Sequence, residues 1–142
     1  MPETEIFRLY NFVIDIQGVT SGYFTEVSGL SISVESIPYR EGGGAPAVRK
    51  LPGRVDYGDV TLKWGMSEST ELWEWLMTTV QGNVERKELS IILLAPDGQQ
   101  ENTRWNLHNA WPTAWRGAHL RGDAQGVAIE TLTIAHEGIE RA

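Results

Sequence analysis

Apolar and polar residues alternate along much of the chain, which is the pattern of β-strands with one buried face. The first such stretch runs from Leu9 to Ile16 and places Phe12, Ile14 and Ile16 on one side. The same alternation predicts further strands at residues 23–37, 57–64, 86–95, 103–111 and 127–136. The chain is therefore predicted to be mainly β.

Glycine and proline residues set the predicted limits of several strands. Gly29 interrupts the long 23–37 run and indicates a bulge or a bend there. Pro96 to Gly98 form a turn after the 86–95 strand, whose centre is apolar on both faces and is expected deep in the fold. Pro112 lacks a backbone donor and is expected to end the 103–111 strand.

One helix is predicted between the third and fourth of these strands. Its apolar residues recur at spacings of three and four, which lines one face: Leu72, Trp73, Leu76, Met77 and Val80. Ser67 or Ser69 can cap its first turn, and Gly82 can end it in a left-handed conformation. Trp75 lies off this face and is expected to be exposed to a neighbouring molecule.

These elements predict the fold class. Six or seven strands with a single helix do not alternate as a parallel α/β sheet requires. A mainly antiparallel β-sandwich or barrel, with one α-helix as a cap, fits best. The length of 142 residues corresponds to one domain, so residues 1–142 are expected to form a single unit.

A segment between two predicted strands, residues 38–53 (the arm), has an unusual composition. It contains three consecutive glycines and the prolines Pro38, Pro46 and Pro52. It is too long for a hairpin turn, and we expect it to form no regular ladder by itself. Because it also carries apolar and charged side chains, it is either a solvated surface loop or an arm that docks on another surface.

Composition and charge limit the function. The formal net charge of −7 argues against stable nucleic-acid binding, which needs a basic face, although nucleic acid or protein could pass through an acidic channel. No apolar run is long enough to span a membrane, and the N-terminus lacks the features of a secretory signal. The chain contains no cysteine, hence no disulfide and no thiolate metal site. We expect synthesis in the cytoplasm.

The chain offers few groups for catalysis or metal binding. No two of its histidines have the close spacing of a zinc site: they are His108, His119 and His136. Asp97, Glu101 and Asp123 are the candidates for a hydrolase, but turn geometry and solubility explain carboxylates at turns better. The three glycines are not followed by the Lys-Ser/Thr of a phosphate-binding loop. We therefore expect no enzyme activity, no cofactor and no metal.

Six tryptophans allow a second functional hypothesis. Three of them are close in sequence and could form an aromatic platform, which would make the chain a carbohydrate-binding β-sandwich module: Trp105, Trp111 and Trp115. The simpler interpretation is that tryptophans fill the core and the interfaces. It assigns Trp64, Trp73 and Trp105 to the core, and Trp75, Trp111 and Trp115 to interfaces.

Several short motifs together carry a resemblance to a known family. They are Phe12-Val13-Ile14-Asp15-Ile16, the stretch Gly22 to Leu30, Tyr39-Arg40-Glu41-Gly42-Gly43, Lys50-Leu51-Pro52-Gly53, Leu62-Lys63-Trp64-Gly65, Glu71-Leu72-Trp73-Glu74-Trp75, Ala110-Trp111-Pro112 and Glu137-Gly138-Ile139. In this order and spacing they resemble the tail tube proteins of contractile-tailed phages, most closely the inner-tube subunits of phage-tail-like extracellular contractile injection systems. The resemblance covers nearly the whole chain.

The resemblance implies a structural protein. In this family six copies form a ring, rings stack into a rigid hollow tube, and a contracting sheath drives the tube through a target membrane. Extended hairpins join across subunits into a barrel that lines the lumen. The implied partners are the sheath protein, baseplate and spike proteins, a terminal cap protein and a lumenal cargo of protein or DNA. The implied location is a phage-tail-like particle, in the cytoplasm or outside the cell after release.

The residues agree with this interpretation independently, because open strand edges must be paired or guarded and a head-to-tail ring leaves none exposed. Polar strand faces suit a water-filled lumen, with the candidates Ser31, Ser33, Glu35, Asp59, Thr61 and Lys63. The arm is expected to dock on a neighbouring subunit or ring. Its candidate residues are Tyr39, Arg40, Glu41, Gly42, Gly43, Gly44, Val48, Arg49, Lys50 and Leu51.

Overall fold

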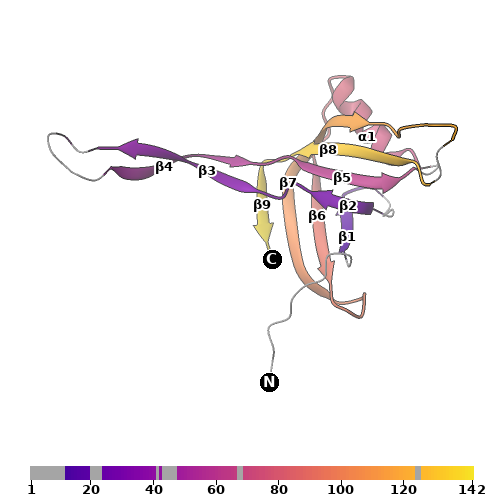
Figure 1. Cartoon of the computed structure of the whole chain (residues 1–142), viewed down its shortest axis with the longest axis horizontal. Coiled ribbons are helices and arrows are strands. Elements are labelled where there is room, and N and C mark those ends of the chain that lie inside the picture. The colour runs from indigo at the N-terminus through magenta and orange to yellow at the C-terminus, as the bar shows by residue number, and fades with distance from the viewer. Residues whose placement is uncertain (1–11, 20–23, 41, 43–47, 67–68, 124–125) are drawn as a thin grey trace.

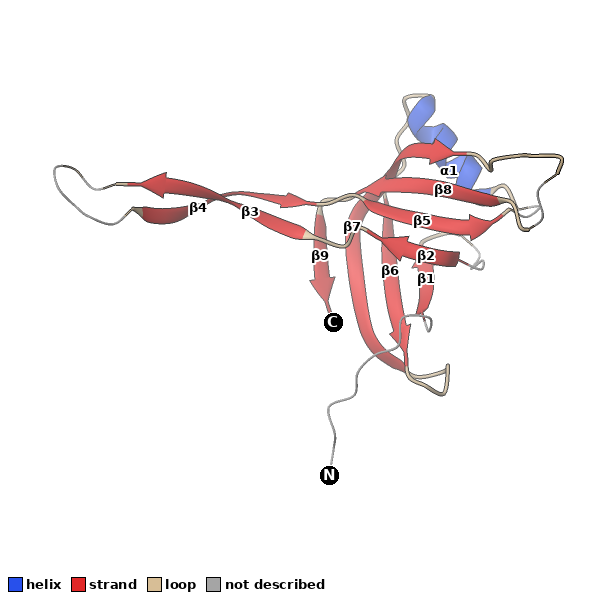
Figure 2. Cartoon of the chain, viewed as in Figure 1, coloured by secondary structure: helices blue, strands red, loops and turns tan. Residues whose placement is uncertain are grey.

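The computed structural model describes residues 12–19, 24–40, 42, 48–66, 69–123 and 126–142. The elements in this part of the chain are β1 (Phe12–Ile16), β2 (Phe24–Ser28), β3 (Ile32–Tyr39), β4 (Arg49–Tyr57), β5 (Val60–Gly65), α1 (Glu71–Val80), β6 (Lys87–Leu94), β7 (Glu101–Arg116), β8 (Ile129–Ala135) and β9 (Gly138–Arg141). The strands pair antiparallel, so the predicted fold class is confirmed (Figure 2). They outnumber the predicted six or seven because Gly29 divides one run, part of the arm is a strand, and β9 adds a further one.

Strand β7 holds the large sheet together. The sheet has the order β1-β6-β7-β8-β5-β2, with β9 also paired to β7. The first part of β7 pairs with β6 and β9, and its last part pairs with β8. Asn109, between these parts, has a φ of 53°, a left-handed conformation that asparagine tolerates better than most residues. The sheet bends here, so that β5 and β8 lie across the view in Figure 1 while β6 and β9 run down it.

The prediction that Pro112 ends its strand is wrong. β7 continues to Arg116, and Pro112 lies opposite Ile134 of β8. The register shifts between Pro112 and Ala114. A proline is tolerated at such an irregularity because the ladder there does not require every backbone donor.

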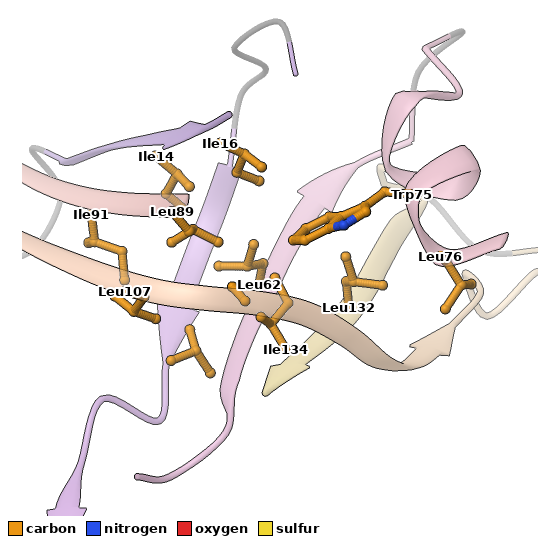
Figure 3. Packing of buried hydrophobic residues seen from close by; sticks show 12 residues of the cluster. Ile14, Ile16, Leu62, Trp75, Leu76, Leu89, Ile91, Leu107, Leu132 and Ile134 are labelled. Carbon is orange, nitrogen blue, oxygen red and sulfur yellow. The ribbon is translucent and has the colours of Figure 1, made fainter. Parts of the chain in front are cut away.

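The core lies inside the bend of the sheet and beneath the helix. Its buried side chains come from β1, β5, β6, β7, β8 and α1 (Figure 3): Ile14, Ile16, Val60, Leu62, Trp75, Leu76, Leu89, Ile91, Leu107, Ala110, Leu132 and Ile134. The alternation predicted for the strands is thus confirmed at the buried positions of β1, β5 and β8. The 86–95 strand lies deep in the fold as predicted, because neighbouring Ile91 and Ile92 of β6 are both buried.

The helix packs on the core with three of its five predicted residues, Leu72, Leu76 and Met77, and with Trp75, which was not predicted. Trp75 is 2% exposed and its Nε1–H donates to the Glu85 carbonyl oxygen at 2.7 Å, whereas Trp73 and Val80 are exposed. The face on the core consists of Leu72, Trp75, Leu76 and Met77, so it is wider than the predicted stripe on the side of Trp75. Trp75 is therefore a core residue and not an interface residue.

The C-terminal end of the helix is as predicted, whereas the N-cap residue is Thr70, whose side chain makes no capping hydrogen bond. Gly82 follows the helix with a φ of +86°, and its N–H donates to the Thr79 carbonyl, as in a left-handed cap. At the other end Ser69 Oγ accepts the Glu71 N–H at a long 3.5 Å. The alternative cap, Ser67, lies outside the described residues.

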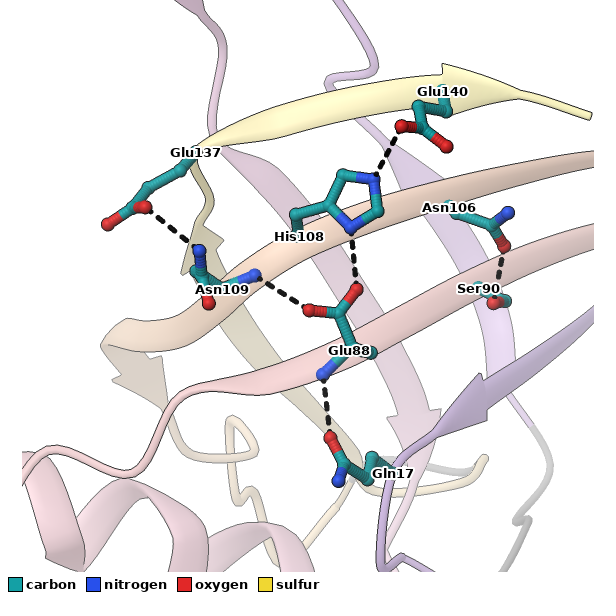
Figure 4. A network of polar contacts seen from close by, with 8 residues as sticks. All are labelled: Gln17, Glu88, Ser90, Asn106, His108, Asn109, Glu137 and Glu140. Atoms are coloured by element: carbon teal, nitrogen blue, oxygen red, sulfur yellow. Dashed lines mark hydrogen bonds and ion pairs between the residues drawn. The ribbon is translucent and has the colours of Figure 1, made fainter.

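A polar network ties together three strands of the large sheet (Figure 4). His108 Nδ1 on β7 lies 2.7 Å from Glu88 Oε2 on β6, and its Nε2 lies 3.3 Å from Glu140 Oε1 on β9. The first contact is an aligned hydrogen bond and the second an ion pair without hydrogen-bond alignment. The hydrogen bond to Glu88, assisted by the charges of Glu88 and Glu140, raises the pKa of His108. Asn109 joins Glu88 to Glu137 in the same network.

We predict that Trp75→Phe lowers the free energy of unfolding by about 2 kcal/mol, because it removes a buried hydrogen bond and leaves a cavity. Trp73→Phe is the matched control on the exposed side of the same helix and should cost less than about 1 kcal/mol. Urea titration followed by far-UV circular dichroism measures both. An equal cost for the two substitutions would contradict the assignment of Trp75 to the core.

We predict that His108→Gln destabilises the fold mainly at mildly acidic pH. The pKa of His108 is raised above its ordinary 6.5 in the folded state, so its stabilising contribution is complete below 6.5 and is lost as pH rises through the folded pKa. The difference in unfolding free energy between wild type and variant should therefore be largest below pH 6.5 and shrink across the pH range above it. His119→Gln, at an exposed position, is the control. A difference that is constant across this range would show that His108 acts by packing alone.

Candidate assembly surfaces

The β3–β4 hairpin projects far from the body of the molecule (Figure 1). Its ladder runs from Ile32 opposite Tyr57 to Tyr39 opposite Arg49. The prediction that the arm forms no regular ladder is therefore wrong for its two flanks, where Tyr39, Arg49, Lys50 and Leu51 are strand residues. Pairing extends outward because each flank has an opposing strand to supply its hydrogen bonds. Arg40, Gly42 and Val48 follow at the tip and are exposed, while Glu41, Gly43 and Gly44 lie outside the described residues.

Large apolar side chains are exposed along this hairpin and at its tip. Seven of them are between 41% and 55% exposed: Ile32, Val34, Ile37, Tyr39, Val48, Leu51 and Val55. A two-stranded sheet has no second layer to cover them, and an isolated hairpin is only marginally stable in water. An apolar surface of this kind on a paired ribbon is typical of an interaction site.

At the root of the hairpin, two glycines allow close contact between the segments that join β3 and β4 to the body. A Cβ at Gly29 would collide with the Asp59 carbonyl oxygen, and one at Gly58 would collide with Ser31 Oγ. Gly29 also has a φ of +94°, which confirms the predicted bend. The predicted 57–64 strand is broken at this root, because Tyr57 ends β4 and Val60 begins β5.

Two rows of mainly polar side chains cross the β2-β5-β8-β7 part of the sheet on the face that points away from the core. The strand register places Glu26, Lys63, Thr131 and Arg116 in one row, and Ser28, Thr61, Thr133 and Ala114 in the other. Lys63 Nζ lies 3.2 Å from Glu26 Oε2 within the first row. We name these eight residues the polar rows. They lie opposite the core face, where Leu62 and Leu132 are buried.

The lumen candidates from the sequence fall in two places. Thr61 and Lys63 belong to the polar rows, whereas Ser31 and Asp59 lie at the hairpin root. Ser33 and Glu35 are exposed on β3 of the hairpin itself. The other members of the polar rows were not among the candidates predicted from the sequence. Period-two alternation in the last long strand signals Thr131 and Thr133, but only the register shows that they stand beside Thr61 and Lys63.

The candidate carboxylates each have a local role. Asp97 Oδ1 accepts the Gln99 and Gln100 N–H groups at 2.9 and 3.2 Å, and these bonds lower the pKa of Asp97. The hydrogen bond from Arg104 lowers the pKa of Glu101. Asp123 pairs with Arg121 at 3.3 Å. Among the described residues no group of three or more His, Asp or Glu side chains could hold a metal ion.

The tryptophans serve packing within the chain. Trp64 and Trp105 are partly buried against the core, as predicted, but Trp73 is 43% exposed and meets Trp115 edge-on with ring centroids 5.0 Å apart. Trp115 Nε1–H donates to Glu130 Oε2 at 3.1 Å. Trp111 is half-buried on β7. No observation on these tryptophans specifically favours the carbohydrate-binding hypothesis.

In the described ranges no helix has the length and apolar character needed to cross a membrane.

Comparisons with solved structures find close similarity over the whole chain. A chain of the PVC sheath-tube complex of an extracellular contractile injection system, in the extended state, is 28% identical, with 98% of this chain and 93% of that chain covered and a TM-score of 0.87. A chain of the PVC sheath/tube terminator is 29% identical, with 99% of both chains covered and a TM-score of 0.87. A chain of the anti-feeding prophage tube terminating cap is 26% identical, with 100% and 94% covered and a TM-score of 0.87.

Two further comparisons concern sequence. A search of curated proteins finds no similar sequence. The family described as T4-like virus tail tube protein gp19 matches residues 8–140, which is nearly the whole chain. The resemblance seen in the sequence is thereby confirmed, and the chain belongs to the T4-like virus tail tube protein family.

Proposed function

We propose that the chain is the structural subunit of the rigid inner tube of a contractile injection machine. Six copies form a ring, rings stack into a hollow tube, and sheath contraction drives the tube through a target membrane. The observation that carries this proposal is the β3–β4 hairpin, which projects from the body (Figure 1) and whose apolar side chains are about half exposed. Similarity to chains from sheath-tube, terminator and cap assemblies supports it.

The role is structural and not enzymatic in this proposal. Its partners are further copies of the chain, the contractile sheath protein, baseplate and spike proteins and a terminal cap protein. The particle is phage-tail-like, assembled in the cytoplasm and active there or after release. A cargo of protein or DNA passes through the lumen without stable binding, because a net charge of −7 repels nucleic acid.

The open strands of the body favour ring formation. β1 and β2 end the order of the large sheet, so each has one edge without a partner strand among the described residues. Such edges invite pairing with another chain. A heterologous contact repeated around a closed ring gives both strand edges of every copy a pairing partner.

The polar rows are the proposed lumen surface. They combine threonine and serine hydroxyls with a Lys63–Glu26 ion pair, and they carry no large apolar side chain. A face of this kind stays hydrated, so it suits the wall of a water-filled channel. The helix covers the opposite face of the same part of the sheet and therefore points outward in the tube.

We predict that shortening the hairpin abolishes assembly but not folding. In the variant, Asn-Gly replaces residues 38–50, which closes the ladder at the Ile37–Leu51 pair with a two-residue turn. Light scattering should give wild-type rings of about 95 kDa, six times the 15.9 kDa chain, and negative-stain images should show rings or tubes. The variant should be monomeric, with an unchanged circular dichroism spectrum. Leu120→Ser, an exposed substitution away from the hairpin, should assemble normally.

Two outcomes would contradict these expectations. A wild-type chain that remains monomeric at high concentration, and also in the presence of sheath and baseplate proteins, contradicts the proposed function. Tubes of normal length from the shortened variant would remove the hairpin from the assembly mechanism while leaving the tube itself intact.

We predict that the polar rows are shielded in assembled tubes. Because the chain has no cysteine, Ala114→Cys and Val80→Cys each introduce a single thiol, the first in the polar rows and the second on the exposed side of α1. In tubes, Ala114→Cys should react with a small maleimide but at least an order of magnitude more slowly with a maleimide on a bulky protein. Val80→Cys should react with both reagents. Equal reactivity of Ala114→Cys toward both would place the polar rows outside the lumen.

A further inference from the structure

The exposed apolar side chains of the β3–β4 hairpin change from one face of the ribbon to the other partway along it. In an antiparallel pair, opposed residues share a face and successive residues alternate. Near the body, one face carries Ile32, Val34, Val55 and Tyr57, which we name the base face. Near the tip, the other face carries Ile37, Tyr39 and Leu51, which we name the tip face.

The spacing of the apolar residues requires this change. On β3, Val34 and Ile37 are three positions apart, so they point to opposite faces. On β4, Leu51 and Val55 are four positions apart and would share a face in a regular strand. The register shifts between Val34 and Ser36, so that β4 has one residue more than β3 within this interval. This bulge brings Leu51 to the face of Ile37 and keeps the two opposite each other.

Gly53 at the bulge makes room for the change. A Cβ at this position would come within 2.8 Å of Ile37 Cδ1 and 3.1 Å of Glu35 Cβ. A larger residue would therefore push the Ile37 side chain from its place on the tip face.

A single flat surface covers only one face of a two-stranded ribbon. We propose that the hairpin binds two different copies of the chain, one through its base face and one through its tip face, an inference that rests on the proposed tube-subunit function. The base face adjoins the subunit's own core, because Tyr57 packs against the buried ring of His136 with centroids 5.7 Å apart. The copy that covers the base face therefore lies beside the body, and the copy that covers the tip face lies farther out.

The charge distribution favours a copy of the same chain as the occupant of both faces. Residues 37–53 contain three basic residues and one acidic residue, whereas the rest of the chain contains nine basic and eighteen acidic residues. The outer half of the hairpin is thus positive, and the remainder of the chain taken together is strongly negative. Opposite charges steer the tip of one copy onto the body of another.

Site-specific cross-linking tests this inference. Val34→Cys labels the base face and Leu51→Cys labels the tip face, each with a photoactivatable maleimide in a chain that has no other cysteine. Ser33→Cys and Lys50→Cys label the opposite faces at the same heights and serve as controls. Each labelled chain is assembled with a large excess of unlabelled chain, irradiated and mapped by mass spectrometry.

The expected result is that Val34→Cys and Leu51→Cys each give covalent dimers, with cross-links to two separate regions of the partner. The doubly labelled chain should give covalent trimers. Assembled protein in which the double label gives only dimers, or both labels reach one region, overturns this inference alone, because one twisted surface then covers both faces. A chain that stays monomeric overturns the proposed function and the inference with it.

Unlabelled variants give a second readout in case a bulky label blocks assembly. Val34→Ser with Val55→Ser removes apolar area from the base face, and Ile37→Ser with Leu51→Ser removes it from the tip face. If the two faces make separate contacts, the two double variants should stop assembly at different stages. One should remain monomeric and the other should form rings that do not stack. Light scattering and negative-stain images distinguish these products. If both double variants stop at the same stage of assembly, the hairpin does not contact two different copies.

Discussion

A two-stranded ribbon cannot bury its own side chains, and this constraint connects most features of the structure. The body follows the ordinary solution, in which a bent sheet and one helix enclose a core. The β3–β4 hairpin carries residues of core type, such as Ile32, Val34 and Leu51, on strands that no second layer covers. The chain therefore encodes part of its hydrophobic burial between molecules, which suits a subunit that functions only in an assembly.

The alternation of apolar and polar residues was sufficient to predict the buried positions of strands that pack within the chain. Alternation identified the buried positions of β1, β5 and β8 because one core decides which face is apolar. On the helix it identified Leu72, Leu76 and Met77 but chose Trp73 over Trp75. Trp75 is buried and donates its Nε1–H to the Glu85 carbonyl, a contact that the helix sequence alone does not reveal. The sequence pattern also misjudged Pro112, since a bulge opposite β8 cannot be read from one strand alone.

The candidate sites were harder to predict because each depends on strand register. The sequence showed that Thr61 and Lys63 face away from the apolar positions, but not that Thr131 and Thr133 stand beside them. Composition described the arm as irregular, although its flanks continue the ladder as far as Tyr39 and Arg49. In both cases the missing information is the identity of the opposing strand. A single strand does not contain this information.

The energetics of the hairpin favour assembly as a closed ring over simple pairing. Covering an aliphatic side chain that is about half exposed gains roughly 1 kcal/mol, so the seven side chains together gain several kcal/mol. Bringing two proteins together costs an estimated 4–15 kcal/mol, which is of the same order. One hairpin contact alone is thus marginal. In a ring, the last subunit makes contacts on both sides for a single loss of translational freedom, so closure is much more favourable than the first pairing, and incomplete rings are expected to be sparsely populated.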